Sequence, residues 1–143
     1  MILFLGTIKY DKVGEDGLQK TVSEKYLFQA EDFTQAEQFF QEQMSPFMSG
    51  EYAIAELKPQ KVAEVLHSGD SLADKWFLAK VAFITLDEKT AKEKRTIQKF
   101  YVQATDFKNA LSAISAELGK CMGEWLIVSL AETPVVDFLQ SES

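Results

Sequence analysis

The sequence predicts an α+β protein made of two β-β-α-β repeats that arose by internal duplication, and three observations lead to this prediction. The segment YLFQAEDF at residues 26–33 returns as FYVQATDF at residues 100–107. Three further blocks match in the same order along the 143-residue chain. In both copies the spacing of apolar residues changes from period two to a helical period at the same point. We expect the repeats to pack with pseudo-twofold symmetry, as an antiparallel-rich sheet with the helices on one face.

The predicted repeats occupy residues 1–67 and 75–143, and the polar segment SGDSLAD at 68–74 links them. A chain of this length suits one compact domain or two very small ones, and we expect the two repeats to form one compact domain. Hydrophobic residues make up 46% of the chain and charged residues 26%, which excludes a disordered protein.

Each repeat is predicted to begin with a long hairpin of two strands. LFLGTIKY at 3–10 aligns with WFLAKVAF at 76–83, and apolar residues alternate in both. A polar, turn-forming segment follows, and the repeated octapeptide then supplies the second strand. The residues expected on one face of the hairpins are Phe4, Ile8, Tyr10, Tyr26, Phe28 and Ala30 in the first copy, and Phe77, Ala79, Val81, Phe83, Phe100, Val102 and Ala104 in the second.

A helix is predicted after each hairpin, with Asp32 or Asp106 as its N-cap. The helices are expected to end near Pro46 and Gly119, which are both common helix stop signals. The repeated octapeptide is therefore explained as a strand end followed by a helix cap, in preference to a binding motif. The predicted apolar stripes are Phe33, Ala36, Phe40, Met44 and Phe47, and Phe107, Ala110, Leu111, Ile114 and Leu118.

A third strand follows each helix, where MSGEYAIAEL at 48–57 aligns with MGEWLIVSL at 122–130. The second copy is apolar on both faces, which predicts a central position in a sheet. VAEVL at 62–66 lies opposite VVDFL at 135–139, and we expect a short helix at 60–67. The sequence leaves open whether the halves share one six-stranded sheet or pack as two layers.

Four segments of the chain resemble a known family: EKYLFQAEDFTQAE (24–37), KWFLAKVAFITLDEKTAKEKRT (75–96), VQATDF (102–107) and ETPVVDF (132–138). They are similar to a domain-of-unknown-function family that is found in Bacteroides-group bacteria and their phages. The similarity runs from Leu3 to Phe138, and FITLDEK followed by a basic stretch is its most distinctive part. The resemblance implies an intracellular, phage-linked or mobile-element setting, and it assigns no activity, cofactor or catalytic residue.

The residues that support catalysis or metal binding are scarce. The single histidine, His67, and the single cysteine, Cys121, lie in different halves and outside any recognised catalytic motif. Zinc sites need several Cys or His ligands, and no glycine-rich phosphate loop is present. Asp87 and Glu88 could help to hold Mg²⁺, but adjacent acids in a polar hairpin are usually solvated. We therefore expect no catalytic residue, no cofactor and no metal site.

Charge is distributed unevenly along the chain, whose net charge is −7. Residues 26–57 contain six acids and no Lys or Arg, whereas residues 75–99 contain seven bases against three acids. The hairpin at 87–99 is thus a candidate contact surface for phosphate or for an acidic partner. The alternative, which we favour, is a solvated hairpin whose lysines discourage edge-to-edge pairing. The candidate contact residues are Lys89, Lys92, Lys94, Arg95, Lys99 and Tyr101.

Taken together, these features favour a non-enzymatic, intracellular protein-interaction module, with another protein or a second copy as its partner. The alternative is a nucleic-acid-binding protein that uses the basic hairpin, with Phe100 or Tyr101 as a stacking ring. A carboxylate-and-metal enzyme is a third and weaker interpretation. No secretory leader and no membrane-spanning stretch are evident, and a single cysteine excludes internal disulfides, so we expect a cytoplasmic location without membrane association.

Overall fold

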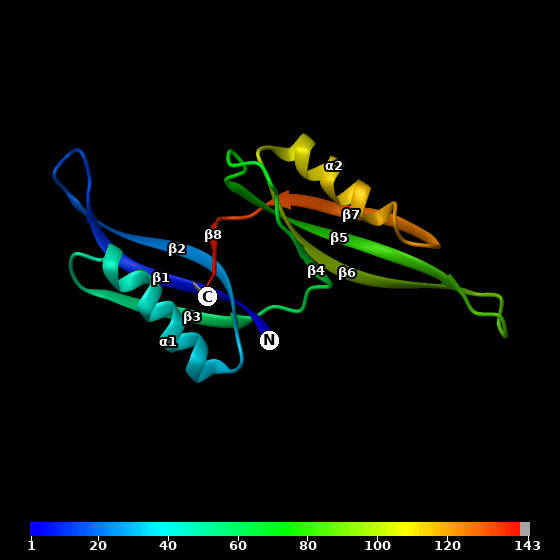
Figure 1. The fold of residues 1–143 in the computed structure, drawn as a ribbon, viewed down its shortest axis with the longest axis horizontal. Helices are drawn as coiled ribbons and strands as arrows, with labels where there is room; N and C mark the ends of the chain where they lie inside the picture. The colour runs from blue at the N-terminus through cyan, green and yellow to red at the C-terminus, as the bar shows by residue number, and fades with distance from the viewer. Residues whose placement is uncertain (141–143) are drawn as a thin grey trace. The chain divides into compact units, whose positions relative to one another are not determined.

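The computed structural model describes residues 1–140 and shows an α+β fold with two helices and two four-stranded mixed sheets (Figure 1). Residues 141–143, the last of the predicted second repeat, lie outside the described residues. The chain divides into two compact units. The first unit combines residues 1–60 with the C-terminal segment that starts at Pro134, and the second unit is residues 61–133.

The first unit contains a sheet with the strand order β3-β1-β2-β8. Strand β1 pairs antiparallel with both β2 and β3, and β8 pairs parallel with β2. The pairing of Ile2 with Ala30 and of Val13 with Gln19 makes β1 and β2 one long hairpin, as predicted. The elements of this unit are β1 (Ile2–Val13), β2 (Gln19–Ala30), α1 (Phe33–Met44), a 3-10 turn (Ser45–Phe47), β3 (Tyr52–Pro59) and β8 (Val135–Leu139).

The second unit has a sheet with the order β4-β6-β5-β7. Its central hairpin is antiparallel, β7 pairs antiparallel with β5, and β4 pairs parallel with β6. Read from β7, this order is β7-β5-β6-β4, which matches β3-β1-β2-β8 of the first sheet strand by strand. The elements of this unit are β4 (Glu64–Leu66), β5 (Lys75–Leu86), β6 (Glu93–Ala104), α2 (Phe107–Leu118) and β7 (Glu124–Glu132).

The fourth strand of each sheet comes from a distant part of the sequence. Strand β4 follows β3 along the chain but pairs with β6, and β8 follows β7 but pairs with β2. The predicted short helix at 60–67 is wrong, because Glu64–Leu66 is a strand and Leu66 packs against the core of the second unit. The predicted repeat boundary at residue 67 places β4 together with β1–β3. In the structure the N-terminal segment of the first unit ends at Gln60, and β4 belongs to the second unit.

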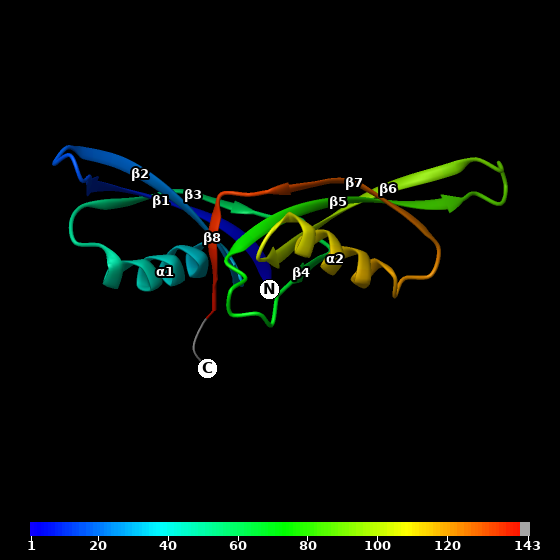
Figure 2. The ribbon, with the colours of Figure 1, turned by 90° about the horizontal axis from the view of Figure 1, so that it is seen from above.

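Both helices begin where the sequence predicts. The carboxylate of Asp32 accepts a hydrogen bond from the amide of Gln35 at 2.8 Å, and Asp106 accepts one from the amide of Asn109 at 2.8 Å. These bonds satisfy amides that have no partner inside the helix. In Figure 2, each helix lies on one face of its own sheet.

Each helix encloses a separate hydrophobic core against its sheet, and the predicted inward faces of the hairpins are confirmed except at Tyr10, which is half-buried and not part of the first core. The helical stripes are narrower than predicted, since Phe33, Phe47, Phe107 and Leu111 are exposed. The buried residues of the first core are Phe4, Ile8, Tyr26, Phe28, Ala30, Ala36, Phe40 and Met44. Those of the second core are Phe77, Ala79, Val81, Phe100, Val102, Ala104, Ala110, Ile114 and Leu118.

The two cores differ at the position of Gly6 on β1, which faces the aromatic rings of the first core. A Cβ atom added at Gly6 would lie 2.7 Å from the ring of Phe40 and 2.8 Å from the ring of Phe28. The second core has Ala79 on its central strand and Ile114 on its helix. The first unit thus combines a large aromatic side chain on the helix with glycine on the strand, and the second combines a smaller side chain with alanine.

Strand β7 lies at the edge of its sheet, and the prediction of a central position is wrong. The apolar residues on both of its faces suggested burial on both faces. One face does pack against the core through Trp125 and Ile127, but Leu126 and Val128 are exposed.

The buried ring of Tyr26 makes the stability of the fold sensitive to pH in the alkaline range. Burial raises the pKa of Tyr26 to about 12, and the carboxylate of Glu24 acts in the same direction. The unfolded chain releases this proton near pH 10. Between about pH 10 and 12 the folded chain therefore holds more protons than the unfolded chain, so the free energy of unfolding falls as the pH rises.

We expect Tyr26→Phe to leave the pH dependence unchanged below about pH 10 and to make the decline above it shallower. Part of the slope should persist, because the pKa values of Tyr10 and Tyr101 are also raised. Urea unfolding of both proteins across this range measures the difference. Equal slopes above pH 10 would contradict the prediction.

Candidate functional site

The turn of the basic hairpin is organised by Asp87. Its amide donates to the carbonyl of Lys92 at 2.9 Å, and its carboxylate accepts from the amide of Lys89 at 2.9 Å. Its carbonyl accepts from the amide of Ala91, a residue with a φ of 56°. Asp87 therefore has a structural role in the turn. Within residues 1–140, no three His, Cys, Asp or Glu residues are grouped so that they could hold a metal ion.

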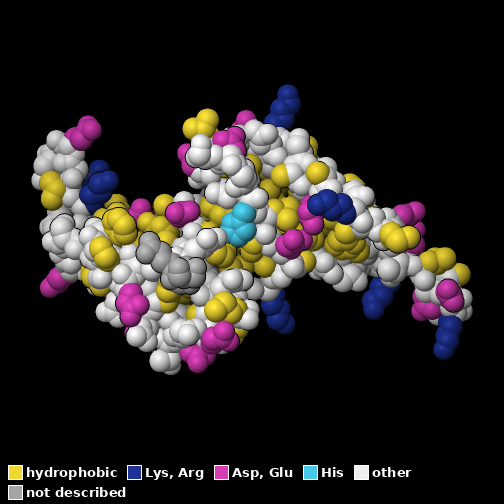
Figure 3. All heavy atoms as spheres, in the orientation of Figure 1, with side chains coloured by type: hydrophobic (Ala, Val, Ile, Leu, Met, Phe, Trp, Pro, Cys, Tyr) yellow, Lys and Arg dark blue, Asp and Glu magenta, His cyan; other side chains and the backbone are white. Residues whose placement is uncertain are grey.

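The six predicted contact residues do not form one surface. All five basic side chains are exposed, and none takes part in an ion pair within residues 1–140. Lys94 shares its side of the sheet with core-facing Phe100, whereas Arg95 and Lys99 point to the opposite side. Tyr101 is only 4% exposed, and burial raises its pKa. Figure 3 shows basic and acidic side chains next to each other at the hairpin tip.

Exposed apolar residues gather on the face of the second sheet that points away from α2. Ile97 on β6 and Leu126 on β7 are direct neighbours of Ala82 on β5 in the pairing register, and Ala82 is buried between them. Ile97 is 52% exposed and Leu126 48%, and Val128 on the same face is 54% exposed. Basic side chains flank these residues. We call this face the outer face, and define it by Lys80, Ala82, Arg95, Ile97, Lys99, Leu126 and Val128.

The first sheet has a different composition at the equivalent row. Lys9 on β1 pairs with Ser23 on β2 and with Ala53 on β3. These are the positions at which the second sheet has Ala82, Ile97 and Leu126. Three adjacent strands therefore have apolar side chains in the second unit where the first unit has polar or small ones.

The edge strands differ in the same way. Strand β3 includes two exposed charged residues and a proline, all of which discourage pairing with another strand. Strand β7 has neither lysine nor proline in its sequence EWLIVSLAE. The β3 residues are Glu56, Lys58 and Pro59, and their counterparts in the register of β7 are Ser129, Ala131 and Glu132.

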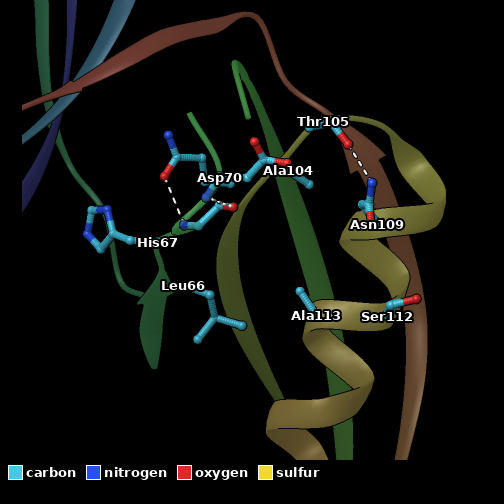
Figure 4. A pocket seen from close by; sticks show the side chains of 10 residues that line it. Leu66, His67, Asp70, Ala104, Thr105, Asn109, Ser112 and Ala113 are labelled. Atoms are coloured by element: carbon cyan, nitrogen blue, oxygen red, sulfur yellow. Dashed lines mark hydrogen bonds between the residues drawn. The ribbon is translucent and has the colours of Figure 1, made fainter. Parts of the chain in front are cut away.

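A shallow pocket of about 360 Å³ lies between the 66–70 segment, the end of β6 and α2 (Figure 4). Its polar groups mainly stabilise the surrounding loops. The side-chain amide of Gln103 accepts from the amide of Ser68 at 3.0 Å and donates to the carbonyl of Ala73 at 3.0 Å. Asp70 accepts from the amide of Leu72 at 2.9 Å. Because these polar groups are used in hydrogen bonds that hold the loop, we interpret the pocket as a result of loop packing and not as a ligand site.

The His67 ring lies at the border of this pocket, on the side away from α2 in Figure 4. It packs edge-on against Trp76, with 5.7 Å between the ring centroids and an interplanar angle of 88°. Cys121 is exposed in the segment that connects α2 to β7.

The outer face was missed by the sequence analysis, although the sequence contained a signal for it. The alignment of 48–57 with 122–130 pairs Ala53 with Leu126 and Ala55 with Val128. We interpreted the apolar residues of the second copy as evidence for a central strand. The same substitutions also fit an edge strand that presents apolar side chains to a partner.

No helix among residues 1–140 is long and apolar enough to cross a membrane. In comparisons with known proteins, residues 2–141 match a family described as Domain of unknown function (DUF4494). No curated protein and no solved structure matches the chain.

Proposed function

The chain belongs to the DUF4494 family, a domain of unknown function that covers nearly its whole length, and from this premise we propose that it acts by binding another protein chain. The proposal assigns the binding to the outer face of the second sheet. It assigns no catalytic step and no cofactor to the protein.

The observation that supports this proposal is the contrast between equivalent rows of the two sheets. Ile97 and Leu126 each leave about half of their surface in water, on either side of Ala82. Burying an apolar side chain of this size completely is worth roughly 1.5–3 kcal/mol, so a partner that covers the row gains part of that energy. Grouped exposed apolar side chains with a polar border are typical of protein interfaces.

The border of the outer face is basic. Lys80 and Lys99 pair directly across β5 and β6, and Arg95 lies two residues before Ile97 on β6. Like charges directly opposite one another destabilise an isolated sheet, and an acidic partner would relieve this repulsion. Such charges increase the rate and the specificity of association more than the affinity. We therefore expect the binding partner to present acidic side chains beside its apolar ones.

The test compares Leu126→Lys with the matched variant Ala53→Lys, which adds the same charge at the equivalent position of the first sheet. The tagged wild-type protein and Ala53→Lys should capture the same protein partner, whereas Leu126→Lys should lose it. Far-UV circular dichroism should show that both variants are folded. Identical capture by all three proteins would contradict the proposal.

We also propose that the fold arose by internal duplication. Its support is the equivalent strand order of the two sheets, the equivalent Asp32 and Asp106 caps, and the matched change from Gly6 and Phe40 to Ala79 and Ile114. Pseudo-twofold packing and a single compact domain stay predictions, and an experimental structure of the full chain would test them.

Nucleic-acid binding by the hairpin at 87–99 stays a prediction as a second function. Its basic residues are exposed, but they divide between two faces, and both proposed stacking rings, Phe100 and Tyr101, are buried. Fluorescent oligonucleotides at low salt test this function. A cytoplasmic setting in Bacteroides-group bacteria and their phages also stays a prediction, which cell fractionation and the neighbouring genes would test.

A further inference from the structure

We propose that the partner of the outer face is a second copy of this chain, and that two chains join edge to edge through β7. The two β7 strands would run antiparallel about a twofold axis centred on Leu126, so that two four-stranded sheets form one eight-stranded sheet. This inference rests on the proposed function, because it names the partner of the same surface.

The free edge of β7 is the first observation. β7 is the last strand of its sheet, and within residues 1–140 its outer edge has no strand partner. An edge strand of nine residues that has no lysine or proline, and whose charges are confined to a glutamate at each end, is a template for pairing with another strand. The edge strand β3 of the first sheet includes Lys58 and Pro59, so the same chain protects one edge and leaves the equivalent edge unprotected.

The register follows from the side-chain directions along β7. The pairing with β5 shifts between Lys80 and Val81, so β7 has an irregularity at Val128. Before this point the alternation is regular: Leu126 lies on the outer face, while Trp125 and Ile127 pack against the core. Opposed residues of antiparallel strands must lie on the same face. A pairing centred on Leu126 meets this condition for residues 124–128.

In this register Leu126 lies opposite Leu126 of the second copy, and Trp125 lies opposite Ile127 of the second copy. An aromatic residue opposite a β-branched residue is a favourable cross-strand pair. The row of Ile97, Ala82 and Leu126 then continues into the same row of the second copy, and one apolar band crosses all the strands of both hairpins. A pairing centred on Val128 would instead oppose Glu124 and Glu132, which repel each other.

The charges of the outer face are complementary in this arrangement. Glu124 lies opposite Val128 of the second copy, and the residue after Val128 is Ser129, which pairs with Lys80. The carboxylate of Glu124 is thus placed beside Lys80 of the second copy, and the twofold axis repeats this contact. Within one chain Glu124 pairs with Ile84, four residues beyond Lys80 on β5, so the two charges meet only across the dimer.

A cysteine cross-link tests the register directly. Cα atoms of directly opposed residues are about 4.5–5.5 Å apart in antiparallel strands, which falls within the range that a disulfide can bridge. In a chain with Cys121→Ser, Leu126→Cys should give a disulfide-linked dimer of twice 16.1 kDa on mild oxidation. The matched chain with Cys121→Ser and Ala53→Cys should form no disulfide-linked dimer under the same conditions, although it still associates through β7.

Light scattering across a concentration series measures the association itself. Leu126→Lys should raise the dissociation constant of the dimer at least about tenfold, because it opposes two buried charges, and Ala53→Lys should leave the constant unchanged. Lys80→Glu and Glu124→Lys should each weaken the dimer, and the chain that contains both changes should recover. A structural role of either residue within one chain would not produce this recovery.

The outcomes separate this inference from the proposed function. A chain that stays monomeric, but captures another protein in a manner that depends on Leu126, overturns the dimer and leaves the proposed function standing. A monomer that captures nothing overturns both. A dimer that Leu126→Cys does not cross-link, or that Leu126→Lys does not weaken, overturns the β7 pairing.

Discussion

Replacing Phe28 with alanine is expected to lower the free energy of unfolding of the first unit by about 3–5 kcal/mol. Phe28 is fully buried, and its ring centroid lies 5.2 Å from that of Phe40, 5.5 Å from that of Phe39 and 6.0 Å from that of Phe4. Removing the ring leaves a cavity lined by side chains of β1 and α1, which cannot all move to fill it.

Tryptophan fluorescence and circular dichroism distinguish the unit that is affected by this change. Both tryptophans, Trp76 and Trp125, belong to the second unit, whereas far-UV circular dichroism reports on both units. In Phe28→Ala, the dichroism signal should begin to change at a lower urea concentration than in the wild type. The control Phe47→Ala removes a ring that is 78% exposed and should change stability by less than about 0.5 kcal/mol. Equal effects of the two substitutions would contradict the described core.

Replacing Gly6 with alanine is expected to destabilise the first unit by about 1–3 kcal/mol, although alanine suits a strand better than glycine does. The new methyl group would meet the rings of Phe40 and Phe28 at 2.7 and 2.8 Å, closer than carbon atoms pack without strain. The rings belong to a tightly packed cluster, so the strand, the helix or both must shift.

The second unit suggests the compensating change. It has Ala79 at the position of Gly6, Val102 at that of Phe28 and Ile114 at that of Phe40, as the pairing registers and the helical positions show. The chain with Gly6→Ala, Phe28→Val and Phe40→Ile should therefore be more stable than the sum of its separate changes predicts. Urea unfolding of the single and combined variants measures this coupling. Additive costs would show that the close approach at Gly6 does not control the packing.

Local patterns were sufficient to predict the parts of the fold that local interactions determine. The alternation of Phe77, Ala79 and Val81 correctly assigned both a strand and its buried face. Asp32 and Asp106 located the helix starts, because a cap acts on an amide only three residues away. The two copies also supported each other, since the same error would have had to occur twice.

The fourth strands could not be predicted in this way. Residues 64–66 are too short for a clear period, and their strand conformation depends on hydrogen bonding to β6, where their partners are residues 100–102. The choice of sheet for β4 and β8 depends on tertiary pairing, and no local pattern encodes it. The predicted central position of β7 was wrong for a related reason. A strand that is apolar on both faces has the same sequence pattern whether a neighbouring strand or a separate partner covers it.

Charge counting along the sequence drew attention to residues 87–99. The structure exposes the five basic side chains of this segment that were named as candidate contacts. It could not show that Lys94 and Arg95 point to opposite faces or that Tyr101 is buried. The apolar row of Ile97 and Leu126 spans strands that are distant in sequence, so only the pairing register brings these residues together.

The parallel pairing of β8 with β2 has a consequence for how the protein is made. During synthesis the strand that completes the sheet of β1, β2 and β3 emerges only after the whole second unit has been made. Until residue 139 has left the ribosome, the outer edge of β2 stays available to other newly made chains. The first unit is therefore completed only after the second unit, and a chaperone that shields this edge would act during the synthesis of the entire second unit.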